Sequence, residues 1–221
     1  MADWRAHVER EEGRYRDGEA RLPEAEDGDV RQRQLTRMGN AAAGAGLAHM
    51  MDGAGDDARE WFDRAVGRYR ESYELAPPGS WGRPIGMMKA RILAGDWDGA
   101  EVDSRWTLEQ HPAEAGSPIG RYAACLALLV LGRDEETRPL ADGLRTHADF
   151  PSSVGDALAF IAAKDPVGYI EAIESVLESF ESRDEYLEDI PVADTVLVLQ
   201  ALAARRDMAA ELSSSLLPQA P

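Results

Sequence analysis

The residues best able to perform chemistry in this chain are its four histidines and its single cysteine. None of the histidines has a second histidine three or four positions away, and they lie far apart, at His7, His49, His111 and His147. Helical zinc sites use such spacings, often as His-Glu-x-x-His, so the sequence predicts no metal site. His111 and His147 both follow expected helices, where a cation near the carboxyl end is favoured.

Cys125 stands in an apolar run over 122–129. A free thiol in such surroundings has the character of a small core side chain. We therefore interpret Cys125 as a packing residue rather than a nucleophile. A lone cysteine also allows no internal disulfide.

Other short patterns resemble ligand-binding motifs without completing them. Gly44-Ala45-Gly46 begins like a dinucleotide fingerprint, but His49 stands where the third glycine should be and no strand precedes it. Asp52, Asp56 and Asp57 lack the ligand spacing of a calcium loop. Neither Gly-Lys-Ser/Thr nor Gly-x-Ser-x-Gly occurs. The sequence thus predicts no catalytic residue and no cofactor.

The elements that would position a binding surface are helices that recur in pairs. Breaks with turn-forming residues lie 32 to 42 residues apart, at Gly53, Gly95, Gly132, Lys164 and Arg206. Such spacings are typical of stacked helix pairs, and no stretch alternates as a half-buried strand would. We expect an all-α, tetratricopeptide-like stack of about ten antiparallel helices. It should form a single domain over 1–221 with a bend over 77–84.

Caps and apolar periodicity place the individual helices. We expect them over 3–21, 30–52, 56–75, 85–93, 98–110, 117–131, about 136–147, 153–163, 167–181 and 195–204. Asp3, Ser117 and Asp165 are expected N-caps. Pro139 is unfavourable in mid-helix, which places a helix start near Glu136. The small residues over 39–46 should let a neighbouring helix approach closely, although each glycine weakens the helix.

The chain is strongly acidic, with 41 acidic and 24 basic residues and a net charge of −17. Only Lys89 and Lys164 are lysines. Nucleic acids and anionic membranes are disfavoured as partners, because both require cationic side chains. Dispersed acidity with so little lysine is what we expect of a salt-accumulating halophile. An acidic face that steers a basic protein partner is the alternative.

The first residues and the lengths of the apolar runs indicate where in the cell the protein is expected. Residues 1–5 already carry Asp3 and Arg5, and no apolar stretch follows them. The longest apolar runs, over 123–131 and 196–199, are too short to span a bilayer. We therefore expect a cytoplasmic protein without a signal peptide.

Two kinds of residue are candidates for binding a protein partner. Trp81, in the boundary loop, would anchor a partner if its ring were exposed, and Tyr186 lies in an acidic loop before the last helix. The expected helix over 167–181 has two faces, an apolar one with Ile170, Ile173, Val176, Leu177 and Phe180 and an acidic one with Glu171, Glu174, Glu178 and Glu181. If the acidic face binds, it would meet a basic surface, and Glu171, Glu174 and Glu178 are its candidate binding residues. The alternative is that the tryptophan packs between helices and that the acidic face is a solvated one.

Two stretches resemble known families. The hairpin over 90–100, with its Gly95-Asp96-Trp97 turn, resembles the inter-helix turn of tetratricopeptide repeats. The region 163–218 is similar to the C-terminal part of the immunity protein 49 family, in Asp184-Glu185-Tyr186-Leu187, the apolar helix over 196–203 and the closing Leu216-Leu217-Pro218. This resemblance implies an all-helical protein that neutralises a partner toxin in bacterial polymorphic toxin systems. It transfers no catalytic motif.

These observations together predict a non-catalytic, protein-binding helical protein, in its most specific form an immunity-type protein. Two alternatives remain open. One is a tetratricopeptide-like scaffold adaptor without a toxin partner. The other is a small enzyme with an acidic pocket between helices, because an acid–base pair is hard to recognise among so many carboxylates.

Overall fold

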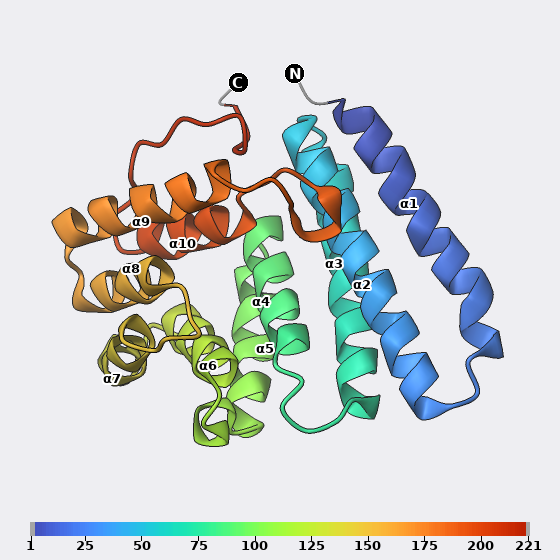
Figure 1. Cartoon of the computed structure of the whole chain (residues 1–221), viewed down its shortest axis with the longest axis horizontal. Helices are drawn as coiled ribbons and strands as arrows, with labels where there is room; N and C mark the ends of the chain where they lie inside the picture. The colour runs from blue at the N-terminus through green and yellow to red at the C-terminus, as the bar shows by residue number, and fades with distance from the viewer. Residues whose placement is uncertain (1–2, 220–221) are drawn as a thin grey trace. The chain divides into compact units, whose positions relative to one another are not determined.

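The computed structural model describes residues 3–219, apart from the side chains of Ala115 and Leu187. This part of the chain is all-α and contains no strand (Figure 1). The ten α-helices are α1 (Trp4–Arg21), α2 (Gly28–Met51), α3 (Gly55–Leu75), α4 (Gly82–Ala94), α5 (Trp97–Glu109), α6 (Pro118–Val130), α7 (Asp134–Arg145), α8 (Ser152–Ala163), α9 (Pro166–Glu181) and α10 (Asp194–Ala204). Short 3₁₀ helices occur at η1 (Leu22–Glu24), η2 (Pro112–Ala115) and η3 (Leu187–Asp189). The all-α helical stack is therefore confirmed.

The described chain divides into two compact units. Unit 1 contains residues 3–96, 185–192 and 217–219, and unit 2 contains residues 97–184 and 193–216. The loop over 77–84, where a bend is expected from the sequence, lies inside unit 1 between α3 and α4. Unit 1 thus includes a segment that follows most of unit 2 in the sequence.

In unit 1, consecutive helices pack against each other, and glycines on α2 make close packing with α3 possible. The aromatic rings of Phe62 and Tyr69 lie against Gly46 and Gly39, where an added Cβ would come within 2.7 Å of ring carbons. Toward α1, Gly44 faces the side chain of Glu11, 3.2 Å from such a Cβ. The expectation that the small residues over 39–46 admit close neighbours is confirmed.

In unit 2, α6 forms the apolar centre. Every residue from 122 to 130 is buried, and α5 and α7 pack on this helix. Further along, α8 packs on α7 and α9 on α8. The segment over 195–204 is a helix rather than a strand, in agreement with its alanine content.

The helix starts lie within three residues of those expected from the sequence. Asp3 and Asp165 accept hydrogen bonds from backbone N–H groups of their own first turns, as expected of N-caps. Ser117 occupies the N-cap position of α6 as expected, but its side chain accepts no hydrogen bond from a backbone N–H group there. Helix α7 starts at Asp134, before the expected start near Glu136, and so contains Pro139. Its first turn carries acidic side chains, which favour a helix start at this position.

Candidate functional site

Helix α9 has one buried and one exposed face. Its buried face carries Ile173, Val176 and Phe180. Glu171, Glu174 and Glu178 are exposed along the other face, and we call these three residues the acidic stripe. The predicted two-faced helix is therefore confirmed, except at Ile170.

The amino-terminal end of the same exposed face is apolar. Val167 is 68% exposed and Ile170 is 40% exposed, although Ile170 was expected on the buried face. Val167 lies four positions before Glu171 and Ile170 four positions before Glu174, a spacing that places each pair on the same side of a helix. The exposed face of α9 thus joins an apolar end to an acidic one.

The acidic stripe lacks cationic neighbours. Helix α9 contains no lysine or arginine, and none of its three stripe glutamates forms an ion pair with a described residue. Like charges at this spacing destabilise a helix by about 0.2–0.5 kcal/mol per pair, and Glu178 also lies near the negative end of the helix dipole. The stripe therefore lowers the stability of α9 and leaves charge available for a partner.

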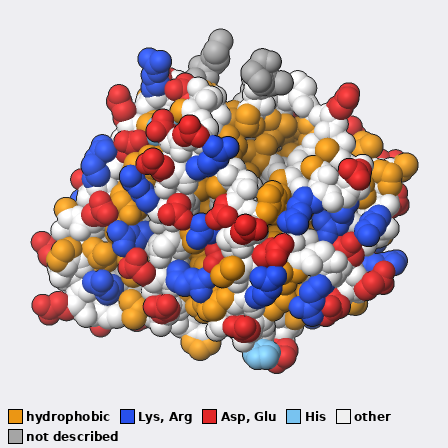
Figure 2. Space-filling view, turned by 180° about the vertical axis from the view of Figure 1, so that it is seen from behind, with side chains coloured by type: hydrophobic (Ala, Val, Ile, Leu, Met, Phe, Trp, Pro, Cys, Tyr) orange, Lys and Arg blue, Asp and Glu red, His pale blue; other side chains and the backbone are white. Residues whose placement is uncertain are grey.

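Elsewhere, acidic side chains are commonly paired. Figure 2 shows acidic and basic side chains interspersed over one face of the molecule. In unit 2, Arg145 contacts both Asp142 and Asp156, at 3.3 and 2.6 Å. Arg206 pairs with Asp134, and both of these side chains are largely buried. The acidic stripe differs from these pairs because it places three glutamates without ion pairs side by side on one helix face.

Trp81 does not present an exposed ring. It is 5% exposed, and its ring centroid lies 6.2 Å from that of Tyr73. Its indole Nε1 is buried and has no hydrogen-bond partner among the described residues. The expectation of an exposed aromatic anchor at Trp81 is wrong, because the loop folds back and places the residue directly before α4, against α3.

Tyr186 lies in a different unit from the acidic stripe. It is half-buried in the segment Glu185–Val192, which belongs to unit 1, whereas α9 belongs to unit 2. Trp81 also belongs to unit 1. The candidate residues therefore do not form one continuous site within either unit, and only the stripe glutamates are both exposed and grouped.

Unit 1 contains a charged cluster that sequence reasoning missed. Glu11 on α1 is fully buried, and its carboxylate accepts hydrogen bonds from Arg10 Nε at 2.8 Å and Arg14 Nη1 at 2.9 Å. Arg14 also pairs with Glu188. One signal was present in the sequence, because Glu11 shares a helical face with two other buried residues, Tyr15 and Gly18.

The cluster continues from Glu188 to α2 and α3. Asn40 donates its Nδ2–H to Glu188 Oε1 at 2.9 Å, and the Tyr69 hydroxyl donates to Asn40 Oδ1 at 2.9 Å. Each side chain of this cluster makes a hydrogen bond or an ion pair with at least one other member. The buried Glu11 carboxylate offers no free charge to a ligand, because it already accepts hydrogen bonds from two guanidinium groups.

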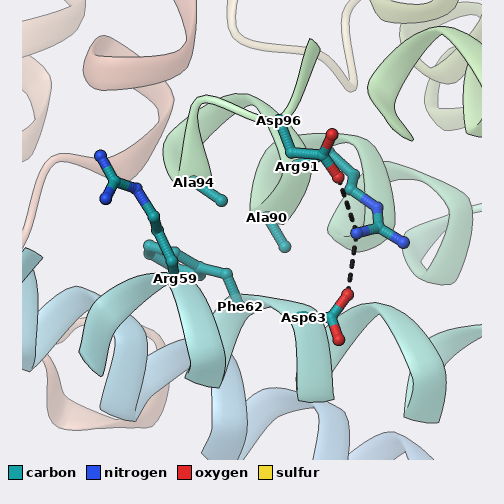
Figure 3. A pocket seen from close by; sticks show the side chains of 7 residues that line it. All are labelled: Arg59, Phe62, Asp63, Ala90, Arg91, Ala94 and Asp96. Atoms are coloured by element: carbon teal, nitrogen blue, oxygen red, sulfur yellow. Dashed lines mark hydrogen bonds and ion pairs between the residues drawn. The ribbon is translucent and has the colours of Figure 1, made fainter. Parts of the chain in front are cut away.

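A small hollow of about 190 Å³ lies between α3 and α4 (Figure 3). It is lined by three apolar side chains, Phe62, Ala90 and Ala94, and by four charged ones, Arg59, Asp63, Arg91 and Asp96. Arg91 Nη1 contacts Asp63 and Asp96 at 2.8 Å each, while Arg59 extends on the opposite side. These charges are already paired, and the volume of the hollow is below the roughly 300–1,000 Å³ of ordinary small-molecule pockets.

Cys125 is fully buried, and burial raises the pKa of its thiol to about 12. No three His, Cys, Asp or Glu side chains among residues 3–219 are grouped as metal ligands. Within the same residues, no helix has the length and apolar character that crossing a membrane requires. Comparisons of the chain with known protein families, curated proteins and solved structures found no match.

Proposed function

We propose that this protein is a non-catalytic binding protein that recognises a basic protein partner through the exposed face of α9. The observation that carries the proposal is the acidic stripe, which has no cation on its own helix and no ion pair to a described residue. A partner with lysine or arginine side chains would remove the repulsion within the stripe. Electrostatic attraction between this partner and the acidic stripe would also increase the rate of association.

The apolar end of α9 supports the same interpretation. Val167 and Ile170 would be covered by apolar side chains of a partner whose cationic groups meet Glu171, Glu174 and Glu178. Interfaces commonly combine an apolar centre with charged surroundings in this way. We therefore propose that the partner surface is amphipathic, with apolar residues adjacent to basic ones.

In its most specific form, the proposal is an immunity-type protein that blocks a partner toxin in the cytoplasm. The resemblance to the immunity protein 49 family supports this form, because the matching region over 163–218 includes α9. The alternative is a scaffold adaptor that holds a basic partner without inhibiting it. Both forms use the same face of α9 and differ in the consequence of binding.

The direct test compares two variants of equal net charge. The first removes the stripe as Glu171→Gln, Glu174→Gln and Glu178→Gln. The control removes three exposed glutamates elsewhere in unit 2, as Glu109→Gln, Glu135→Gln and Glu211→Gln. Affinity purification in the native salt, followed by mass spectrometry, identifies the partner, and its affinity for each variant is then measured with purified proteins.

We expect the wild type and the control variant to bind the same basic partner, and the stripe variant to bind it at least about tenfold more weakly. Equal affinity for the two variants would exclude the stripe as the binding surface. Co-expression with the identified partner separates the two forms of the proposal. Rescue of growth indicates an immunity protein, whereas stable binding without rescue indicates a scaffold.

A further inference from the structure

The segment Glu185–Val192, which we call the strap, lies on α1 and α2 within unit 1 although it is distant from both in sequence. Arg10 Nη2 donates to the backbone carbonyls of Glu188 and Asp189 at 2.8 and 3.2 Å. The Glu188 side chain is held by Arg14 and Asn40. One arginine thus holds the strap backbone, and a second holds its carboxylate.

The strap backbone is unfavourable without these contacts. Glu188 and Asp189 have φ angles of 57° and 54°, in the left-handed region. This region costs a non-glycine residue about 1–2 kcal/mol, and two such residues occur in succession here. The conformation therefore depends on the arginines and Asn40 rather than on local preference.

The contacts that hold Glu188 and Asp189 are polar and accessible to solvent ions. The side chains of Arg10 and Arg14 are 39% and 43% exposed. The ion pair of Arg14 with Glu188, whose side chain is 16% exposed, is weakened by salt. The hydrogen bonds of Arg10 to the two carbonyls join a charge to a dipole and are weakened in the same direction. The end of the strap differs, because Ile190 and Val192 are each 3% exposed and are held by apolar burial, which salt does not weaken.

We propose that residues 185–189 form a charge-controlled latch, which is docked on α1 and α2 at low ionic strength and released at high ionic strength. Ile190 and Val192 stay in place as its fixed end. Release uncovers Arg10, Arg14 and Asn40, and it allows Glu188 and Asp189 to leave the left-handed region. The latch lies in unit 1 and does not depend on the partner proposed for α9.

Proteolysis of the full-length chain by a glutamate-specific protease tests the latch. In the docked state the Glu188 side chain is bound by Arg14 and Asn40, so cleavage after Glu188 requires release. Cleavage after Glu211, which is exposed and lies outside any helix, serves as the reference. The ratio of the two rates removes the effect of salt on the protease itself.

We expect this ratio to rise about tenfold between about 0.05 M and about 1 M NaCl. At low salt, Arg14→Gln and Arg10→Gln should each raise it by about tenfold, the effect of losing a charge-assisted hydrogen bond. The matched control is Arg16→Gln, on the same helix, which loses only an exposed pair with Glu12 and should leave the ratio unchanged. None of these substitutions alters the cleaved sequence.

Circular dichroism shows whether each variant remains folded. If an arginine variant unfolds, the salt series on the wild type decides the question alone. A ratio that does not change with salt overturns the latch. So does an equal ratio in Arg14→Gln, Arg10→Gln and Arg16→Gln when all three are folded.

Discussion

The ring of Tyr69 on α3 lies so close to Gly39 on α2 that an added Cβ at position 39 would be 2.7 Å from two ring carbons. The same ring meets Gly86 of α4, where an added Cβ would also lie 2.7 Å away. The hydroxyl is fixed as well, because it donates to Asn40 Oδ1 at 2.9 Å. The ring therefore cannot move away from either glycine.

Gly39→Ala should lower the free energy of unfolding by about 1–2 kcal/mol, because the added methyl group overpacks this contact against the ring of Tyr69. This is a net change, in which the roughly 1 kcal/mol that alanine gains over glycine within a helix offsets part of the overpacking cost. The control is Gly67→Ala on α3, which is exposed and has nothing within 4 Å of an added Cβ. It should stabilise the protein, and chemical denaturation measures both changes. A stabilising Gly39→Ala would contradict the packing described here.

Glu174 lies between two other stripe glutamates, three residues after Glu171 and four before Glu178. Glu174→Gln should raise the free energy of unfolding by about 0.5 kcal/mol at low salt, since it removes two repulsive pairs. In molar KCl the gain should disappear, because the charges are screened. Glu101→Gln is the control and should destabilise, as Glu101 pairs with Arg105 at 2.8 Å. Thermal melts of both variants at low and high salt make the comparison.

The net charge of −17 has a consequence for the whole chain. If the acidity reflects a salt-rich environment, molar KCl should raise the melting temperature markedly by screening self-repulsion. If it instead serves a basic partner, the isolated protein should respond little to salt. Melting curves in increasing KCl distinguish these two explanations of the acidity.

His7 should make stability depend on pH. Burial lowers the pKa of His7 below its ordinary 6.5, and the nearby charge of Arg10 lowers it further, against smaller opposing effects of Glu11, Asp3 and Asp189. The folded state thus binds this proton less readily than the unfolded state. The stabilising contribution is complete above pH 6.5 and is lost as pH falls through the lowered pKa. His7→Gln should lose less stability than the wild type between about pH 7.5 and about pH 5.5 in urea denaturation; an equal loss would contradict it.

Cys125 should be inert in the folded protein. Its thiol is fully buried and its pKa is raised to about 12, so the reactive thiolate is scarce at neutral pH. Iodoacetamide should leave the native protein unmodified and should alkylate one site in denaturant. Rapid alkylation of the native protein would show that the thiol is reachable, and mass spectrometry measures the result.

The sequence alone determined the helices and much of their burial. Helix periodicity, the caps at Asp3 and Asp165 and the apolar run around Cys125 are local properties, and a helix forms from contacts between residues three or four apart. The exposure of the acidic stripe was predictable for the same reason. Its glutamates follow the spacing of one face, and apolar residues follow the spacing of the other.

Tertiary structure alone decided which residues meet across the chain. Trp81 is buried because its loop returns to α3, and the burial of Glu11 is possible because Arg10 and Arg14 flank it and Gly44 leaves it room. The contact of Arg14 with Glu188 joins positions that no local pattern relates. Such pairings depend on how helices pack, and many sequences of equal periodicity would pack differently. The helices were therefore readable from the sequence, whereas the charged cluster and the strap were not.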